Sequence, residues 1–155
     1  MGWIGRSLIF DLLKRFIRRR FPRVPRLTTI EFAQKLEDSK EFHPLVLDAR
    51  SEEEYAVSHL IDARRIDINS VTLKQALKEP TNQAIVVYCS VGYRSAKVVH
   101  QLQQAGFNQI FNLEGGLFQW ANEQRSLFHA GQPTQRVHPY NAVWGLLIER
   151  RDRAD

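Results

Sequence analysis

Two patterns of apolar residues alternate along the chain: short continuous apolar runs, and apolar residues spaced three or four positions apart. Short, mostly apolar runs predict strands at 45–47, 84–88 and 110–113, and a further short strand is predicted at 64–68. Elsewhere apolar residues recur three or four positions apart, which predicts helices at 30–36, 52–58, 71–77, 95–105 and 117–124. Strands that alternate with helices predict an α/β fold, with a mostly parallel central sheet of about five strands and helices on both faces.

Two of the predicted helices begin with a capping signal. Thr28 with Glu31, and Ser51 with Glu54, have the spacing of a capping box, in which each side chain bonds the backbone N–H of the other residue. The glycine pair at 115–116 is interpreted as a turn former, because its spacing does not match a phosphate-binding loop and no lysine follows it.

Residues 1–26 have a helical pattern and then two prolines that end it. One face of this helix is expected to be apolar and consists of Ile9, Leu12, Leu13, Phe16 and Ile17. The opposite face is expected to be basic and consists of Lys14, Arg15, Arg18 and Arg19. The apolar stretches are too short and too interrupted by charge to span a bilayer. Three interpretations stay open: peripheral membrane contact through residues 1–21, packing on the protein's own core or on a partner, and an organelle transit peptide.

The positive charge of the chain is concentrated in this N-terminal segment. The 155 residues carry a formal net charge of +5. Residues 1–26 hold eight Lys or Arg and one acid, a net +7, which leaves −2 for the remainder because the total is +5. A slightly acidic main domain argues against nucleic-acid binding. We therefore expect three parts: an N-terminal helix and linker (1–26), a main domain (27–125) and a C-terminal extension (126–155).

The C-terminal extension carries an apolar patch but no catalytic pattern. The patch consists of Val143, Trp144, Leu146, Leu147 and Ile148. We expect it to pack against the N-terminal helix, lie on a membrane, or bind a partner. His129 and His138 are too isolated in the sequence to indicate a metal site.

Cys89 is the only cysteine in the chain. A single cysteine excludes an internal disulfide and a multi-cysteine metal site. It also favours a reducing compartment, which we expect to be the cytoplasm. Since no second cysteine can resolve a modified Cys89 within one molecule, sulfur bound there would have to leave to an external acceptor.

The stretch 84–105 carries the candidate chemistry. Cys89 ends a predicted strand, and the loop CSVGYR leads into a predicted helix. A tight loop at a helix N-terminus turns backbone N–H groups inward, and with the helix dipole these groups favour an anion or a thiolate. Gly92 eases such a turn, and Arg94 adds a positive charge for an anionic substrate. We therefore predict a reactive cysteine.

Three segments together resemble single-domain rhodaneses, a family of sulfurtransferases: VLDARSEEEYAVSHL, CSVGYRS and FNLEGGLFQWANE. The resemblance implies a rhodanese-like α/β fold over most of the chain and a catalytic Cys89 that carries a persulfide sulfur. It implies a substrate-binding loop made of Ser90, Val91, Gly92, Tyr93, Arg94 and Ser95. The sequence departs from the family at SHLIDA, where a Gly-His-Ile-Pro-Gly-Ala run is usual.

The predicted activity is that of a thiosulfate sulfurtransferase. A small anionic donor such as thiosulfate would give its outer sulfur to Cys89, and a thiol, cyanide or protein acceptor would remove it. Electrostatic preorganisation by the loop would supply most of the catalysis, so no metal or organic cofactor is expected.

Two alternatives come from other classes of protein. One is a cysteine phosphatase or arsenate reductase, but related phosphatases have five residues between cysteine and arginine and usually a histidine before the cysteine. This chain has four residues there, and Tyr88 before the cysteine. The other is a non-catalytic, membrane-associated interaction module on a rhodanese scaffold.

Three further polar residues are interpreted as structural. Asp48 and Arg50 lie at a strand end, where an ion pair or a backbone cap is the simpler explanation. His59 has no acid or nucleophile near it in sequence, which favours a structural hydrogen bond over a role as a base.

Overall fold

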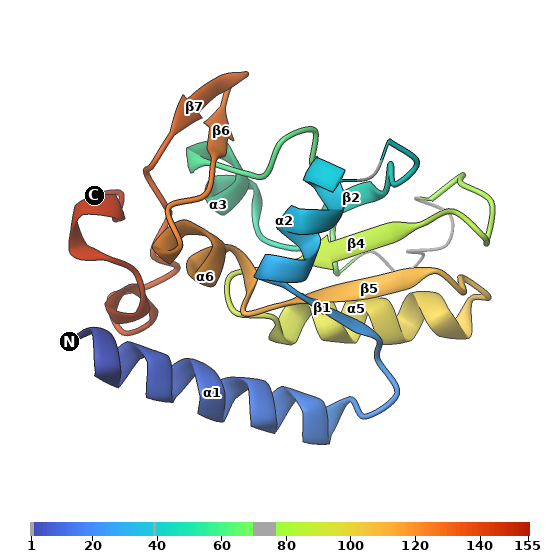
Figure 1. Ribbon diagram of the computed structural model, residues 1–155, viewed down its shortest axis with the longest axis horizontal. Coiled ribbons are helices and arrows are strands. Elements are labelled where there is room, and N and C mark those ends of the chain that lie inside the picture. Colours follow the sequence, from blue (N-terminus) through green and yellow to red (C-terminus); the bar gives the residue numbers. More distant parts are fainter. Residues whose placement is uncertain (1, 39, 70–76) are drawn as a thin grey trace.

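The computed structural model describes residues 2–38, 40–69 and 77–155. Its α-helices are α1 (Trp3–Arg20), α2 (Thr29–Asp38), α3 (Glu52–Val57), α5 (Tyr93–Gln104) and α6 (Gly116–Asn122) (Figure 1). Its strands are β1 (Arg26–Thr28), β2 (Leu45–Asp48), β3 (Arg64–Arg65), β4 (Ile85–Tyr88), β5 (Ile110–Glu114), β6 (Leu127–His129) and β7 (Gln132–Thr134). Two short 3-10 helices, η1 (Trp144–Leu147) and η2 (Arg150–Asp152), follow near the C-terminus.

Five strands form one parallel sheet in the order β1-β5-β4-β2-β3. Residues of β4 alternate between two apolar clusters: Val86 and Tyr88 pack with α2 and α6 on one face, and Ile85 and Val87 pack with α5 on the other. This alternation follows from the period of two in a strand. The predicted α/β fold, with helices on both faces of a five-stranded sheet, is confirmed.

The main domain matches most of the predicted elements. The strands predicted at 45–47, 84–88 and 110–113 correspond to β2, β4 and β5, and both predicted capping boxes form. The helix predicted at 95–105 begins two residues earlier, at Tyr93. The helix predicted from 71 to 77 falls almost entirely outside the described residues.

Helix α1 packs along the main domain (Figure 1). Phe10 and Ile17 are buried, one in each apolar cluster. Of the three interpretations of this segment, packing on the protein's own core is therefore observed. Leu12 and Phe16, expected on the same broad apolar face, lie at its outer edge and are 55% and 56% exposed.

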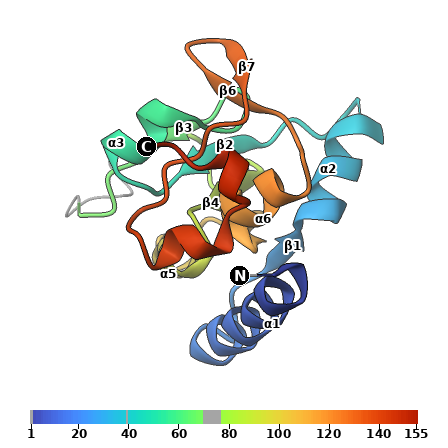
Figure 2. The same ribbon diagram turned by 90° about the vertical axis from the view of Figure 1, so that its left-hand side faces the viewer.

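The C-terminal segment packs on the end of the molecule where α1 begins (Figure 2). Leu147 and Ile148 are buried in the apolar cluster that also holds Phe10 of α1, and Glu149 forms an ion pair with Arg6 of α1. Two of the five residues of the predicted patch are thus buried in the folded unit, and Trp144 is partly buried against it, whereas Val143 is 73% exposed.

In the described part of the chain, no helix combines the length and the apolar character needed to cross a bilayer.

Candidate active site

Cys89 follows the last residue of β4, the central strand of the sheet. Its side chain is only 1% exposed and belongs to the apolar cluster under α5. The chain then turns into α5 at Gly92, whose φ of +107° is a left-handed conformation that favours glycine. This turn directs the backbone N–H of Gly92 at the sulfur, with the nitrogen 3.1 Å from Sγ.

Ser95 and Asn112 hold the other side of the sulfur site. Ser95 Oγ lies 3.4 Å from Sγ of Cys89 and donates its hydroxyl proton to Oδ1 of Asn112 at 2.6 Å. The amide of Asn112 in turn donates to the carbonyl of Gly92 at 3.0 Å. The Ser95 hydroxyl has one proton and two acceptors within reach, the Asn112 oxygen and the Cys89 sulfur. Asn112 thereby fixes both groups that touch the sulfur.

Arg94 is paired inside the protein. Its guanidinium donates two hydrogen bonds of 2.8 Å to the carboxylate of Glu54 and one of 3.0 Å to Ser90 Oγ, which donates to Glu54 at 2.9 Å. The sequence predicted that Arg94 offers its charge to an anionic substrate, but the structure places a buried carboxylate against that charge.

The electrostatics of Glu54 reflect this pairing. Burial by itself would raise the pKa of the carboxyl, but hydrogen bonds from Arg94, the Ser51 backbone and Ser90 outweigh it and lower the pKa to about 2. Burial lowers the pKa of Arg94, but the hydrogen bonds to Glu54 and the attraction of Cys89, Glu54 and Tyr140 together raise it by more, so the net direction is upward. The pair is therefore fully ionised at neutral pH.

The start of α6 supports the loop from behind. The N–H groups of Leu117 and Phe118 donate to the carbonyls of Cys89 and Ser90, at 2.9 and 3.0 Å. A Cβ atom at Gly116 would lie 2.5 Å from the Ser90 carbonyl oxygen and 2.6 Å from that of Cys89. The glycine pair does form a turn, as expected, and it also permits this close approach.

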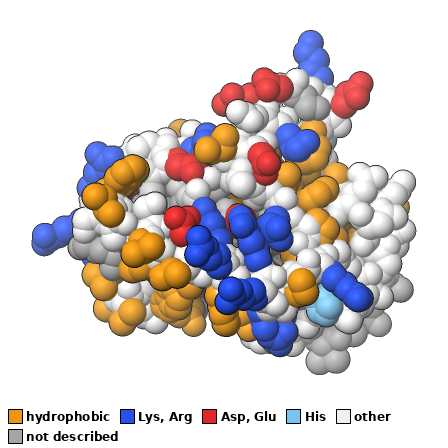
Figure 3. Space-filling view, turned by 60° about the horizontal axis from the view of Figure 1, so that its bottom comes forward, with side chains coloured by type: hydrophobic (Ala, Val, Ile, Leu, Met, Phe, Trp, Pro, Cys, Tyr) orange, Lys and Arg blue, Asp and Glu red, His pale blue; other side chains and the backbone are white. Residues whose placement is uncertain are grey.

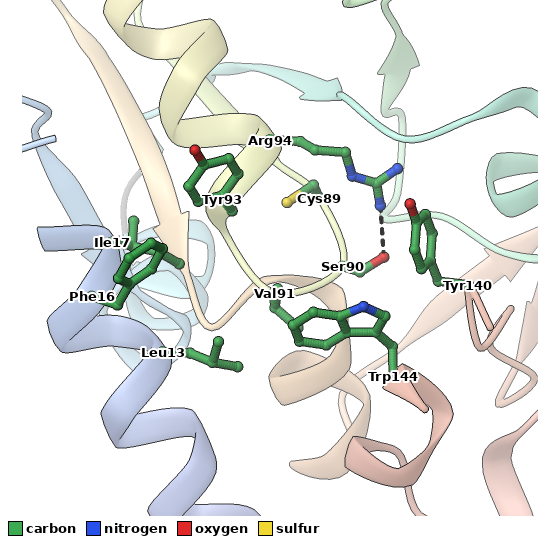
Figure 4. Close-up of a pocket in the computed structure, with 10 residues that line it drawn as sticks. All are labelled: Leu13, Phe16, Ile17, Cys89, Ser90, Val91, Tyr93, Arg94, Tyr140 and Trp144. Atoms are coloured by element: carbon green, nitrogen blue, oxygen red, sulfur yellow. Dashed lines mark hydrogen bonds between the residues drawn. The ribbon is translucent and has the colours of Figure 1, made fainter. Parts of the chain in front are cut away.

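A cavity of about 340 Å³ lies over the loop (Figure 4). Five predicted site residues line it: Cys89, Ser90, Val91, Tyr93 and Arg94. One wall comes from Leu13, Phe16 and Ile17 of α1, and another from Tyr140 and Trp144 of the C-terminal segment. The remaining predicted residues contact the sulfur of Cys89: Gly92 as the N-cap of α5 and Ser95 from its first turn.

Aromatic contacts fix parts of these walls. The ring of Phe16 stacks on Tyr93 with 6.1 Å between centroids, and Phe21 meets Tyr93 edge-on at 5.5 Å. The guanidinium carbon of Arg94 lies 5.0 Å from the ring centre of Tyr140. Both terminal segments are therefore attached to residues of the loop.

Asp48, Arg50 and Tyr88 form a separate buried network. The carboxylate of Asp48 pairs with Arg50 at 2.7 Å and accepts a hydrogen bond from the Tyr88 hydroxyl at 2.6 Å. Arg50 also donates to the backbone carbonyl of Ser58 at 2.7 Å. These contacts match the structural interpretation of Asp48 and Arg50. His59 bonds the carbonyl of Tyr55 and stacks on its ring, which is again a structural role.

Two residues of this site were not singled out by sequence reasoning. Glu54 was explained by its capping box, which hid its pairing with Arg94, 40 residues away. Asn112 had a visible signal, because a polar amide in the otherwise apolar run IFNL calls for a buried partner. No cluster of three or more His, Cys, Asp or Glu side chains suited to a metal ion occurs in the residues that the structure describes.

Several known proteins are similar to this chain. A sulfurtransferase from Allochromatium vinosum is 29% identical over 89 residues, which cover 57% of this chain and 80% of that protein. A tRNA uridine(34) hydroxylase from Buchnera aphidicola is 32% identical over 88 residues, 52% of this chain. The match covers only 26% of that longer enzyme.

Solved structures resemble the same part of the chain. The crystal structure of a rhodanese-like domain protein from Staphylococcus aureus aligns with a TM-score of 0.55 and 33% identity, over 63% of this chain and 91% of that one. Thiosulfate sulfurtransferase from Pseudomonas aeruginosa aligns with a TM-score of 0.63 over 77% of this chain and 22% of that one. Its 22% identity supports a common fold alone.

The family model for the rhodanese-like domain matches residues 28–123. This range contains the sheet from β2 to β5, the Cys89 loop and the start of α6 that supports it. With the matching architecture and the similar structures, it establishes the family: the chain belongs to the rhodanese-like domain family.

Proposed function

We propose that the protein is a sulfurtransferase in which Cys89 carries a sulfane sulfur as a persulfide. The observation that carries this proposal is the position of Cys89, which lines a cavity at the end of the central strand and accepts the Gly92 N–H at its sulfur. A thiolate or persulfide is best held where fixed donors face it without reorganisation. The sulfurtransferase among its relatives supports the same chemistry.

The proposed first half-reaction uses thiosulfate as the donor. The Cys89 thiolate attacks the outer sulfur of thiosulfate, a new S–S bond forms, and the bond to the sulfonate sulfur breaks. Sulfite leaves with the electron pair of that bond, and Cys89 holds a persulfide anion. An acceptor thiolate, cyanide or protein thiol then attacks the outer sulfur and returns Cys89 to the thiolate. Ser90 to Ser95 form the loop that surrounds these steps.

Mass spectrometry of the intact protein tests this proposal. After incubation with thiosulfate, we expect the mass to rise by one sulfur atom, to return on addition of cyanide, and to stay constant in a Cys89→Ser variant. An unmodified wild-type protein whose Cys89 also resists alkylation would contradict the proposal and favour the interaction module. Turnover of an aryl phosphate would instead favour the phosphatase.

We also propose that α1 holds the protein peripherally on an anionic membrane. The outer side of this helix carries an apolar stripe at four-residue spacing, Ile4, Leu8 and Leu12, with exposed fractions of 78%, 60% and 55%. Exposed Arg15 and Arg19 continue this side toward the end of the helix. Figure 3 shows Lys and Arg side chains gathered on this face beside hydrophobic ones. Such a surface suits the interface between lipid chains and anionic headgroups.

Vesicle co-sedimentation tests the membrane proposal. We expect binding to vesicles with anionic lipid, weaker binding to neutral vesicles or in raised salt, and loss of binding in a Leu8→Asp/Leu12→Asp variant. Ile30 of α2 is 53% exposed and lies outside the stripe, so Ile30→Asp is the matched control. Equal binding by the stripe variant and the control would contradict the proposal. The location proposed here is the cytoplasmic side of a membrane.

A further inference from the structure

The cavity over Cys89 is apolar on most of its surface. Three aliphatic or aromatic side chains of α1 form one wall, and Trp144 forms part of the opposite one. Val91 and Tyr93 extend this surface to the loop itself (Figure 4). A ligand that fills this space would exchange water for hydrocarbon contacts, which favours an apolar group.

The size of the cavity exceeds what an inorganic sulfur donor needs. Its volume of about 340 Å³ is roughly twice that of a cavity of about 150 Å³ that accommodates benzene. The space is therefore sufficient for a substituted aromatic ring or a medium alkyl chain.

The charge at the cavity is balanced before any ligand enters. Among the described residues that line the cavity, Arg94 is the one Lys or Arg, and both of its carboxylate contacts are to Glu54. An anionic ligand would compete for Arg94 with the carboxylate of Glu54, which is only 2% exposed. Since the charge of Arg94 is already paired, the apolar walls are the feature that distinguishes one sulfur acceptor from another.

The apolar walls belong to this chain's extensions. Residues 13, 16 and 17 precede the matched family domain at 28–123, and residues 140 and 144 follow it. The shared domain supplies the loop, whereas the two extensions supply most of the surface that selects what reaches it. A specificity determined by these walls is thus a property of the extended chain.

We propose that the sulfur acceptor is a thiol with an apolar alkyl or aryl group, bound in this cavity. The inference rests on the proposed persulfide of Cys89. The acceptor thiolate attacks the outer sulfur of the persulfide, one S–S bond forms, and the bond between that sulfur and Sγ breaks. The electron pair returns to Sγ as the thiolate, and the outer sulfur leaves bound to the acceptor as an apolar persulfide anion.

A chain-length series tests the proposal on the full protein. Cys89 is first loaded with sulfur from thiosulfate or inorganic polysulfide, and its discharge is then followed by mass spectrometry. The probes are 1-propanethiol, 1-butanethiol and 1-hexanethiol, whose thiol groups have similar acidity, and the anionic 2-mercaptoethanesulfonate. We expect the second-order rate constant to rise by up to about fourfold per methylene, the equivalent of about 0.8 kcal/mol. The anionic thiol should be slower than propanethiol.

A matched pair of variants assigns the effect to the cavity wall. Phe16 and Ile30 are 56% and 53% exposed on two different helices, and Phe16 alone of the two lines the cavity. Phe16→Lys should flatten the chain-length dependence and speed discharge by 2-mercaptoethanesulfonate at least threefold. Ile30→Lys should leave the whole series as in the wild type.

The outcomes separate this inference from the proposed function. If no sulfur can be loaded on Cys89, the sulfurtransferase proposal fails and the acceptor class falls with it. If Cys89 loads but all alkyl thiols discharge it equally, or the anionic thiol is fastest, the apolar acceptor alone is overturned. An equal change in Phe16→Lys and Ile30→Lys would also overturn it.

Discussion

At the scale of single residues, Glu54 connects the fold to the loop. It is the third residue of α3, completes the capping box with Ser51, and pairs with Arg94 across 40 positions of sequence. One buried carboxylate therefore serves both the capping box and the ion pair. The position of the Cys89 loop is thus tied to the start of α3.

Stability should depend on the ionisation of Glu54. Its pKa falls from an ordinary 4.5 to about 2 in the folded protein, so its contribution is complete above pH 4.5 and is lost as the pH falls through 2. A difference of this size corresponds to about 3 kcal/mol. Urea unfolding should therefore show that the gap between the wild type and Glu54→Gln shrinks by about 3 kcal/mol from pH 6 to pH 2.

The neighbouring Glu52→Gln variant is the control for this experiment. Glu52 is an exposed carboxylate in the same helical turn. Its unfolding free energy should follow that of the wild type across the range. A gap of constant size between Glu54→Gln and the wild type at both pH values would contradict the assigned pKa.

At the scale of elements, the approach of α6 to the Cys89 loop is controlled by Gly116. Alanine there would combine a left-handed φ of +62° with contacts of 2.5 and 2.6 Å to two carbonyl oxygens of the loop. Backbone in both places must shift, and the bonds from Leu117 and Phe118 would weaken. We expect Gly116→Ala to lower the free energy of unfolding by at least about 3 kcal/mol, measured by urea denaturation.

Gly131 is the control that separates the effect of a left-handed backbone from the effect of close contacts made by the added Cβ atom. Its φ is +76°, yet a Cβ atom there would meet nothing within 4 Å. Gly131→Ala should therefore lower the free energy of unfolding by only about 1 kcal/mol, the energy needed to place alanine in a left-handed conformation. Similar losses in the two variants would mean that the contact between α6 and the loop contributes little.

The elements that could be predicted are those whose own residues show a clear apolar pattern. Ile85 to Tyr88 are all buried and apolar, so β4 could be recognised without its neighbours. Strand β1 was missed, because Arg26–Thr28 has one inward apolar residue, Leu27, and gains its structure by pairing with Leu113 of β5. Strand β7 was not predicted either, because it contains Pro133, and proline has no N–H to donate and occurs in strands mainly at sheet edges.

In the site, too, the parts formed by residues close together in sequence could be predicted, whereas the contacts between distant segments could not. The loop from Cys89 to Ser95 could be predicted, because a strand, a turn and a helix follow one another within a few residues. Its walls could not, because Phe16 and Trp144 meet the loop only after α1 and the C-terminal segment fold back. The pairing of Arg94 with Glu54 depends on the same kind of long-range placement.

At the scale of the whole molecule, the two extensions and the main domain form one packed unit. Phe10 of α1 and Leu147 of η1 belong to the cluster that covers Val86 and Leu113 of the sheet. Arg6 and Glu149 join the extensions directly. An N-terminal helix that was only a tether would leave the stability of the sheet unaffected, whereas this arrangement makes the helix part of the core.

The Phe10→Ala variant distinguishes these cases. Phe10 is 6% exposed, and removing a buried phenylalanine ring typically costs about 3 kcal/mol through lost burial and the cavity left behind. We expect that loss in urea unfolding of the full chain, with one transition seen alike by circular dichroism and tryptophan fluorescence. Trp3→Ala, at a position that is 76% exposed on the same helix, should change the stability by less than about 0.5 kcal/mol. If Phe10→Ala also left the midpoint unchanged, α1 would not be part of the folded unit, and the wall that it gives to the Cys89 cavity would be lost with it.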